Sequence, residues 1–478
     1  MHKLIFDPEL LRRYDKSGPR YTSYPTAVQF RSAGSTSAAG AGMRESGHNG
    51  FGPEQYRRCA EGTNRDKPGR PLSLYFHIPF CDTVCFYCAC NKIVTKNRKR
   101  ASPYLARLHR EIELQGALFD QHRSVDQLHW GGGTPTFIAP DEMRELMAIT
   151  RRHFRLRDDD QGEYSIEVDP REANEEIIAL LRELGFNRLS LGVQDFDPQV
   201  QKAVNRIQSE DETFSVLASA RRHGFRSVNM DLIYGLPHQT VESFGRTLEK
   251  IIAAGPDRLS VFNYAHLPQM FKTQQQINEA ALPSPQTKLG ILQLTIERLT
   301  AAGYVYIGMD HFAKPDDELA VAQRNGTLYR NFQGYSTHAD CDLVGLGVTA
   351  IGQVGASYGQ NLRTLDEYYE RLDAGELAVY RGVELDADDR LRRDVIQRLI
   401  CHFTLDIPRV EREHNIRFRD YFGAELADLA GMQQDGLLIV EESAITVEPR
   451  GKLLIRNICM VFDKYLRKQE GQRFSRVI

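Results

Sequence analysis

Two patterns of apolar residues alternate along the chain from residue 71 onward. Short runs rich in β-branched and aromatic residues predict strands, and the stretches between them, whose apolar positions recur every three or four residues, predict amphipathic helices. The predicted strands are 72–78, 125–130, 163–168, 187–193, 227–234, 257–264 and 305–309. The clearest predicted helices are 104–119, 175–185 and 247–255, and glycines suited to a helix C-terminus stand at Gly185, Gly255 and Gly303.

This repeated strand–helix–strand order favours parallel strands joined by right-handed crossovers. Six or seven such units predict an α/β fold built as a partial (βα)6 barrel of the TIM type, with a doubly wound sheet as the alternative. We expect the barrel to span 71–365. In a barrel of this kind the chemistry lies at the C-terminal ends of the strands.

The regions on either side of the barrel have a different character. The first, 1–70, is expected to form an N-terminal arm. It holds the Tyr-, Pro- and Arg-rich segment 17–26 and a Gly/Ala/Ser-rich insertion, 31–50, which we interpret as flexible. The last, 366–478, is expected to be a mainly helical domain with a small hairpin. Its predicted elements are helices at 391–403 and 425–436, a hairpin at 437–449 and a final helix at 450–469.

Composition narrows the class of protein. The 478 residues are 41% hydrophobic and 26% charged, as in soluble globular proteins. The net charge of −3 lacks the basic excess typical of nucleic-acid binding, and no apolar run approaches the roughly 18 residues of a membrane span. The N-terminal sequence MHKLIFD meets an acidic residue too early for a signal peptide. We therefore expect a cytoplasmic protein in a reducing compartment, with no nucleic-acid partner.

Half of the eight cysteines stand in one short loop after the first predicted strand: Cys81, Cys85, Cys88 and Cys90. In a reducing compartment such a cluster binds metal or does redox work. Structural zinc usually takes pairs of cysteines separated by a longer stretch, so that four ligands can surround the ion. Ligands within one tight loop fit an iron–sulfur cluster better, with three thiolates and an open fourth iron. A structural zinc site is the alternative.

Polar or glycine-rich residues follow six successive predicted strands, which favours a site at that end of the barrel. The second strand ends in a turn of three glycines, Gly131 to Gly133. After the third strand, Asp169 with Glu172 is best explained as a helix N-cap and capping box, which leaves Glu167 available to ribose hydroxyls or a cation. The later strands are followed by Gln194, Asp195 and Arg206, by Asp231, Tyr234 and Gly235, and by Asn263, Tyr264, Ala265 and His266.

The spacing Cys81-x3-Cys85-x2-Cys88, with the aromatic Tyr87 directly before the third cysteine, resembles the signature of the radical S-adenosylmethionine (SAM) enzymes. The resemblance implies a four-iron four-sulfur (4Fe-4S) cluster held by these three cysteines, whose open iron binds SAM. It also implies one-electron cleavage of SAM to a 5′-deoxyadenosyl radical. Cys90 is not expected to be a ligand.

A closer resemblance covers nearly the whole chain outside 31–50. The segments SGPRYTSYPT, LYFHIPFC, LHWGGGTPT, SIEVDPRE, NRLSLGVQDF, DLIYGLP and NFQGYST are similar to those of the oxygen-independent coproporphyrinogen III dehydrogenase family. The family reaction converts two propionate side chains of coproporphyrinogen III to vinyl groups, giving protoporphyrinogen IX in haem biosynthesis, with two SAM molecules. The resemblance further implies a low-potential electron donor, of unknown identity, and a monomer.

The family also implies roles for individual residues. The first SAM would contact Tyr75, Gly132, Glu167 and Ile351. The second SAM would contact Tyr87, Gly133, Thr134, Gln194, Arg206, Asp231 and Ala265. The candidate catalytic residues are Tyr75, Glu167, Phe332 and Gln333, the last two near the reaction centre. Because arginine suits bidentate contacts with carboxylates, Arg20 and Arg171, together with Lys16, are candidates to bind the substrate's propionates.

One departure from the family pattern and one rival function complete the picture. Ala89 stands between Cys88 and Cys90, where the family has glycine. A related class of radical SAM proteins binds haem as a chaperone, and this is the alternative function. That class lacks the fourth cysteine and the SGPRYTSYPT segment, whereas this chain has both.

Overall fold

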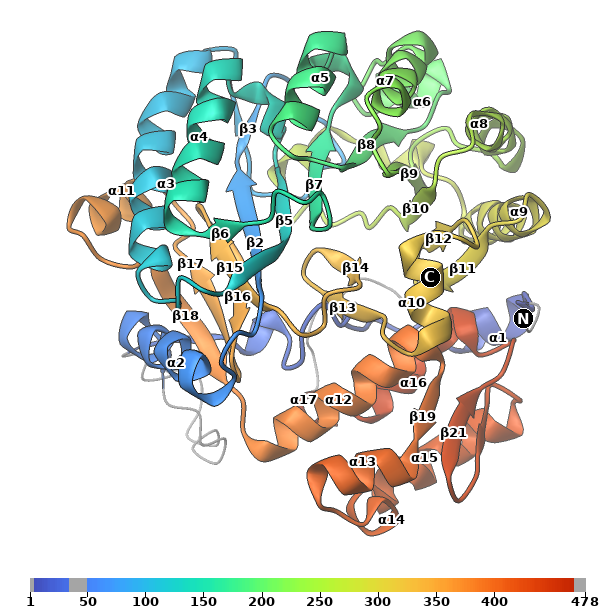
Figure 1. The fold of residues 1–478 in the computed structure, drawn as a ribbon. Helices are drawn as coiled ribbons and strands as arrows, with labels where there is room; N and C mark the ends of the chain where they lie inside the picture. The colour runs from blue at the N-terminus through green and yellow to red at the C-terminus, as the bar shows by residue number, and fades with distance from the viewer. Residues whose placement is uncertain (1–3, 34–49, 468–478) are drawn as a thin grey trace.

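The computed structural model describes residues 4–33 and 50–467 (Figure 1). Most of the insertion that we expected to be flexible, 34–49, lies outside the described residues. The described part begins with a short helix, α1 (Pro8–Arg13), and an extended segment that ends in a 3-10 turn at 27–29. Helix α2 (Pro53–Asp66) then leads into the barrel. No helix among these residues is long and apolar enough to cross a membrane.

Six parallel strands form the barrel, and each pairs with the next along the chain. They are β2 (Leu72–Ile78), β5 (Ser124–Gly132), β7 (Glu163–Val168), β8 (Arg188–Gln194), β9 (Ser227–Tyr234) and β10 (Arg258–Asn263). The helices that cover their outer face are α3 (Ala101–Gly116), α4 (Pro140–His153), α5 (Glu175–Glu183), α7 (Glu210–Arg222), α8 (Val241–Ala254) and α9 (Pro285–Ala301) (Figure 1). The strand order follows the chain order, which confirms the partial (βα)6 barrel over a doubly wound sheet.

The sheet continues beyond these six strands on both sides. Next to β2 lie the parallel strand β15 (Asp342–Leu346) and then the antiparallel strands β16 (Ile351–Val354), β17 (Ser357–Asn361), β18 (Val379–Glu384) and β1 (Arg31–Ser32). Next to β10 lie the antiparallel strands β12 (His311–Ala313) and β11 (Val305–Gly308). The seventh predicted strand is therefore an edge strand and not a seventh parallel unit, and the sheet extends past residue 365 to Glu384.

The inner face of the barrel is polar, and the strand pattern explains why. In β9, Val228, Met230 and Leu232 are buried, whereas Asn229 and Asp231 line a cavity inside the barrel. Side chains alternate between the two faces of a strand, so the apolar set packs under the helices and the polar set points inward. The barrel interior is thus built to hold polar groups.

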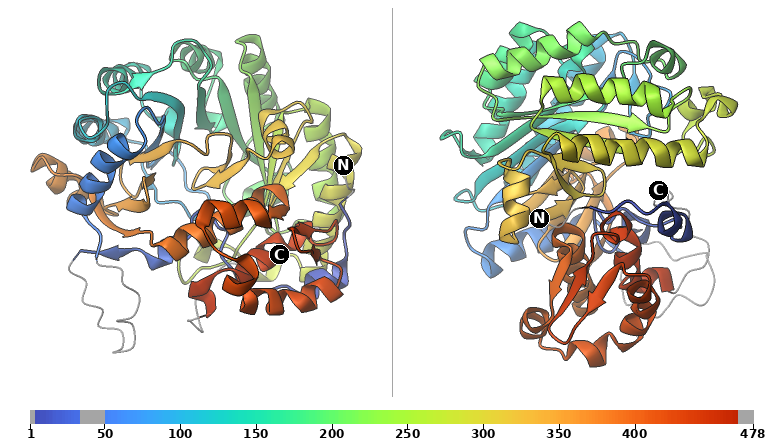
Figure 2. Two further views of the ribbon diagram at one scale, coloured as in Figure 1. Left: turned by 60° about the horizontal axis from the view of Figure 1, so that its bottom comes forward. Right: turned by 90° about the vertical axis from the view of Figure 1, so that its right-hand side faces the viewer.

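The C-terminal region packs against β11, α10 (Glu318–Asn325) and β13 (Tyr329–Asn331), at the edge where the barrel does not close (Figure 2). Its elements are α12 (Ala387–His402), β19 (Thr404–Asp406), α13 (Ile407–His414), α14 (Phe418–Tyr421), α15 (Gly423–Gln434), β20 (Leu438–Val440), β21 (Ala444–Val447), α16 (Ile455–Val461) and α17 (Lys464–Arg467). The predicted hairpin is present as β20 and β21, within a three-stranded sheet.

The single final helix predicted over 450–469 is wrong. Helix α16 ends at Val461, and the short helix α17 begins at Lys464. Between them, the Asp463 carboxylate accepts a hydrogen bond from the Tyr465 backbone N–H at 2.9 Å. A side chain that satisfies a backbone donor in this way starts a new helix, so Asp463 divides the segment in two.

The arm is fixed between the barrel and the C-terminal region. The Tyr21 hydroxyl donates to Asp463 at 3.0 Å, and the Lys464 backbone N–H donates to the Tyr24 hydroxyl at 3.1 Å. On the barrel side, Arg330 Nε donates to the Arg20 carbonyl at 3.3 Å. Tyr21 and Tyr24 share one buried apolar cluster with residues of β11 and α12. The arm therefore joins the two larger units.

Candidate functional site

The cysteine loop follows β2 and is held by a short parallel ladder between β3 (Phe80–Cys81) and β4 (Ile93–Val94). The Thr95 backbone N–H donates to the Cys81 carbonyl at 2.9 Å. A cavity of about 180 Å³, which we call the cysteine cavity, is lined by all four cysteines of the loop, Cys81, Cys85, Cys88 and Cys90, together with residues of β7, β8 and β9. All three predicted ligands therefore face one space.

Positive and hydrogen-bonding groups surround these sulfurs. Thr134 Oγ1 lies 3.6 Å from Cys81 Sγ, and Arg206 Nη1 lies 3.6 Å from Cys85 Sγ. A hydrogen bond from Cys90, supported by Lys92, lowers the pKa of Cys88 to about 6 against the effect of burial. Burial raises the pKa of Cys81 to about 11, so Cys88 is the sulfur that these surroundings favour as a thiolate, the form that binds iron. The donor set thus fits a 4Fe-4S cluster.

The glycine turn after β5 is required by packing. A Cβ atom at Gly132 would lie 2.7 Å from the His77 ring, and one at Gly133 would lie 2.6 Å from the Phe80 carbonyl. Gly132 also has a φ of +114°, which disfavours other residues. Its backbone N–H donates to Glu167 Oε2 at 3.1 Å. The turn therefore brings its backbone close to β2 and orients the Glu167 carboxylate.

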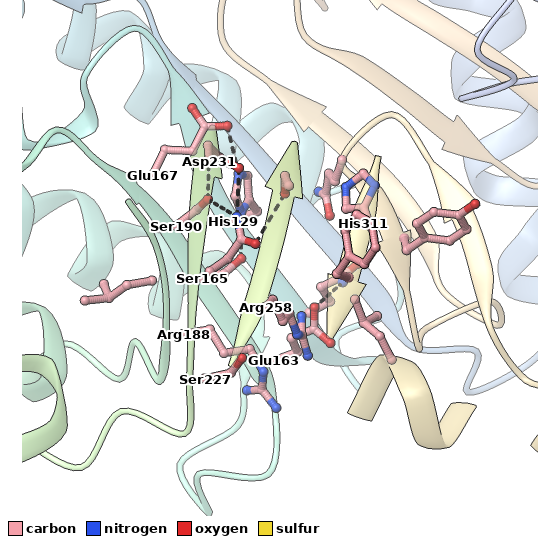
Figure 3. A pocket seen from close by; sticks show the side chains of 18 of the residues that line it. His129, Glu163, Ser165, Glu167, Arg188, Ser190, Ser227, Asp231, Arg258 and His311 are labelled. Carbon is pink, nitrogen blue, oxygen red and sulfur yellow. Dashed lines mark hydrogen bonds and ion pairs between the residues drawn. The ribbon is translucent and has the colours of Figure 1, made fainter. Parts of the chain in front are cut away.

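Glu167 stands at the point where three cavities meet. It lines the cysteine cavity, a barrel cavity of about 250 Å³ inside the strands, and a Tyr75 cavity of about 430 Å³ beside β2 and β16. Burial opposes its ionisation, but hydrogen bonds from His129 and the Gly132 N–H hold the pKa of the carboxyl below its ordinary value. Glu167 is thus an ionised acceptor shared by all three cavities, and Figure 3 shows it in the barrel cavity.

The other acidic residues at the strand ends are more fully engaged. Asp231 accepts hydrogen bonds from Ser190 at 2.9 Å and Asn229 at 2.8 Å, and burial raises its pKa. Asp169 accepts from the Arg171 N–H as the predicted N-cap and also pairs with Arg171 and Arg206.

One prediction about this segment needs correction. Glu172 does not complete a capping box around Asp169, since its carboxylate binds Arg98 at 2.7 Å. The Arg171 guanidinium binds the Asp169 carboxylate through two hydrogen bonds, of 3.0 and 2.7 Å, and lines the cysteine cavity. Its proposed role in binding a propionate stays a prediction.

The structure separates the candidate cofactor residues into the two cavities that flank Glu167. The Tyr75 cavity is lined by Tyr75, Gly132, Glu167, Phe332, Gln333 and Ile351. The cysteine cavity is lined by Tyr87, Gly132, Gly133, Thr134, Glu167, Gln194, Arg206 and Asp231. Ala265 lines none of the three cavities. Its carbonyl accepts from Gln274 Nε2 at 3.2 Å, and the same nitrogen donates to the Tyr87 carbonyl at 3.0 Å.

Several cavity residues were missed by sequence reasoning. The barrel cavity is lined by Arg188, Arg258, Glu163 and His311, and the Tyr75 cavity by Arg363 and Arg381 (Figure 3). The signal for the first group was present, because polar residues occupy alternate positions of β8, β9 and β10. Of the arm candidates, Lys16 is exposed and lines none of the cavities, whereas Arg20 packs over Phe262 in the wall of the barrel cavity.

Comparison with known proteins gives consistent results. The Radical SAM superfamily model matches residues 75–251, and the HemN C-terminal domain model matches 385–454. The oxygen-independent coproporphyrinogen III oxidase of Pseudomonas aeruginosa is 55% identical over 473 residues, covering 99% of each chain. The protein of the same name from Escherichia coli is 50% identical over the whole of both chains.

A solved structure agrees with these sequence matches. The coproporphyrinogen III oxidase (HemN) from Escherichia coli, described as a radical SAM enzyme, superposes with a TM-score of 0.89 at 49% identity. The match covers 97% of this chain and 100% of that one. The barrel and the C-terminal region thus have counterparts in one solved enzyme, and the chain belongs to the oxygen-independent coproporphyrinogen III oxidase family of radical SAM enzymes.

Proposed function

We propose that this protein decarboxylates two propionate side chains of coproporphyrinogen III to vinyl groups without dioxygen and gives protoporphyrinogen IX. The observation that carries the proposal is the full-length identity of 55% and 50% to two enzymes named for this substrate. The cavity with three cysteines supports it, because it supplies the ligands that a radical SAM cluster needs.

The bound cofactors supply a primary carbon radical strong enough to remove a hydrogen atom from the β-carbon of a propionate. Each propionate loses that hydrogen atom, then carbon dioxide and one electron, and becomes a vinyl group. The electron passes to a one-electron acceptor. The chain's own part is to bind, orient and shield the reacting groups.

The two cavities that meet at Glu167 support a pair of adjacent SAM sites. We assign the first SAM to the Tyr75 cavity, where Tyr75, Glu167 and Ile351 line one space with Phe332 and Gln333. We assign the second to the cysteine cavity, which Arg206 and Asp231 also line. Glu167, as an ionised carboxylate, accepts hydrogen bonds from SAM hydroxyl or amino groups.

Phe332 and Gln333 connect this pair of sites to the barrel interior. Gln333 lines both the Tyr75 cavity and the barrel cavity, and its Nε2 atom has no partner among the described residues. The Phe332 ring packs edge-on against Tyr358 at 6.1 Å. We therefore place the reacting propionate near these two residues. A cytoplasmic monomer, supplied by a low-potential electron donor, completes the proposal.

Anaerobic turnover tests the proposed function. The full chain, reconstituted with iron and sulfide, is incubated with coproporphyrinogen III, SAM and a chemical reductant. We expect protoporphyrinogen IX, two carbon dioxide and two 5′-deoxyadenosine per substrate. Stable haem binding without vinyl product would support the chaperone alternative instead, and zinc in place of iron would contradict the cluster.

A further inference from the structure

A buried cation without a counterion packs over Tyr335, whose ring lines the barrel cavity. Arg330, in β13, is 2% exposed. It forms no ion pair with any described residue, and its Nη1 atom has no hydrogen-bond partner among them. A buried guanidinium without a carboxylate is costly to the fold, so its retention indicates a partner from outside the chain.

The two arginines that line the barrel cavity show that the chain can pair such charges with its own carboxylates. Arg258 binds Asp317 at 2.8 Å, and Arg188 binds Glu318. Both lie in the strands and line the barrel cavity itself. Arg330 is thus an exception within its own surroundings, not an example of a general shortage of acidic groups.

Arg20 brings a second guanidinium to the same wall from the arm. It lies 5.9 Å from the centre of the Phe262 ring, and Arg330 lies 4.7 Å from the centre of the Tyr335 ring. Both rings line the barrel cavity and pack edge-on against His311 between them. Arg20 is bound to Asp310, yet 33% of its side chain is accessible, so a ligand can reach it.

The electrostatics of this wall are positive. Burial, followed by the charges of Arg330 and Arg456, lowers the pKa of Arg20 to about 9. Two further buried nitrogens on the wall lack partners among the described residues: Nδ1 of His311 and Nε2 of Gln333. Cations and unsatisfied nitrogen atoms gathered at one wall fit an anion, and the planar guanidinium forks fit a carboxylate.

We propose that Arg20 and Arg330, with Gln333 beside them, form a carboxylate seat that holds a propionate of the substrate during turnover. This inference rests on the proposed function, since coproporphyrinogen III carries four propionates and only two react. Glu167 and Gln333 both line the barrel cavity. The seat therefore holds the tetrapyrrole by a side chain that is not reacting while another reaches the pair of SAM sites.

Binding of an unreactive porphyrin tests the seat. The reconstituted full chain, without SAM, is titrated with coproporphyrin III and with its tetramethyl ester, and porphyrin fluorescence reports the dissociation constant. We expect the wild type to prefer the acid. Arg330→Met and Arg20→Met should weaken binding of the acid at least tenfold, about 1.4 kcal/mol, and leave the ester unaffected. Arg330→Lys should retain part of the preference.

Two controls separate the seat from a structural role. Lys16→Met removes the same charge from an exposed position of the arm and should bind like the wild type. Arg330→Met, without porphyrin, should unfold close to the temperature of the wild type, because it removes an unpaired buried charge as well as the hydrogen bond to the Arg20 carbonyl. Unfolding at a clearly lower temperature, or unchanged affinity for the acid in both arginine variants, would overturn the proposal.

The outcome is separable from that of the proposed function. Vinyl product from the wild type tests the reaction, whereas the acid-to-ester preference tests the seat in the absence of SAM. A wild type that prefers the acid but makes no vinyl product would leave the seat intact and contradict the reaction. A wild type that makes product while both arginine variants match it in affinity would contradict the seat alone.

Discussion

Two buried charged groups lie at different places in the barrel. The chain supplies ionic partners for one and no carboxylate for the other. At the start of β15, Asp342 receives Arg123 at 2.5 Å, Arg70 at 2.9 Å and the Thr63 hydroxyl at 2.8 Å. Near the arm, Arg330 has no carboxylate among the described residues. The difference teaches that this fold can satisfy buried charges completely, and leaves them open where it binds something else.

Among groups that the fold leaves available to a ligand, loss of a cysteine ligand should have the largest effect. Cys81→Ser, Cys85→Ser and Cys88→Ser should each lose the cluster and all activity, because these three cysteines have the radical SAM spacing and line the cysteine cavity. Iron and labile sulfide content after anaerobic reconstitution measures this loss. Cys90→Ser is the control and should retain about four irons. Loss of iron from Cys90→Ser would show that the ligand set is wrong.

In the Asp342 cluster, whose charges are paired within the chain, Arg123→Met should destabilise the fold without changing the candidate functional site. The change removes one of the two guanidinium partners of the buried Asp342 carboxylate, which keeps Arg70 and the Thr63 hydroxyl. It should cost about 1.5–3 kcal/mol, the value for a hydrogen bond to a charged group. Urea denaturation of the Arg123→Met and Arg330→Met variants side by side measures the contrast. If both arginines cost the same stability, the distinction between paired and open charges fails.

Glu111 is a buried carboxyl group with partners inside the chain, and its contribution to stability depends on pH. It is buried and accepts hydrogen bonds from Tyr368, Asn361 and the Gly347 N–H, yet burial raises its pKa to about 7. The folded state thus retains a proton that the unfolded chain releases near pH 4.5. This contribution to stability is present at low pH and is lost as the pH rises through 7.

Glu111→Gln should remove that dependence. Between pH 4.5 and pH 8, Glu111 should lower the free energy of unfolding of the wild type by up to about 3 kcal/mol, and the variant should lack this slope. Urea denaturation at several pH values measures it. The absolute stability of the variant is a separate matter, because glutamine offers one acceptor oxygen fewer. An unchanged slope would mean that the Glu111 carboxyl titrates normally.

Glu167→Gln should have the smallest effect on free energy and leave the fold intact. The amide keeps the size of the side chain but removes the charge that SAM would meet, at a cost of about 2 kcal/mol, the value for a hydrogen bond to a charged group. The KM for SAM in anaerobic turnover should rise about thirtyfold, with an unchanged melting temperature. A lower melting temperature with an unchanged KM would show that Glu167 stabilises the fold and does not bind SAM.

Much of the barrel could be predicted because its strands are buried on the helix-facing side and differ clearly from the helices. The bounds of β2, β7 and β9 match the prediction. Strands β16 to β18 were missed, and each is interrupted by one glycine. At Gly382 a Cβ atom would lie 2.1 Å from the Tyr358 carbonyl of the neighbouring strand and 2.5 Å from the Phe51 ring. Both neighbours are brought close only by folding, so no local pattern could reveal this requirement.

The candidate site likewise has a part that the local sequence predicts and a part that only folding brings together. The spacing of the cysteines is local, and it predicted a set of ligands that does share one cavity. The positive wall depends on Arg20 and Arg330, which are brought together only by folding of the arm onto β13. Neither residue is distinguished in the sequence from an ordinary surface arginine.

The position of the arm has a consequence for synthesis of the protein. Residues near position 20 are made long before their anchors Arg330 and Asp463. The arm therefore cannot dock completely until residue 463 has been translated, well after the cysteine loop. Until then, a partly made enzyme lacks the means to position a porphyrinogen beside its radical chemistry.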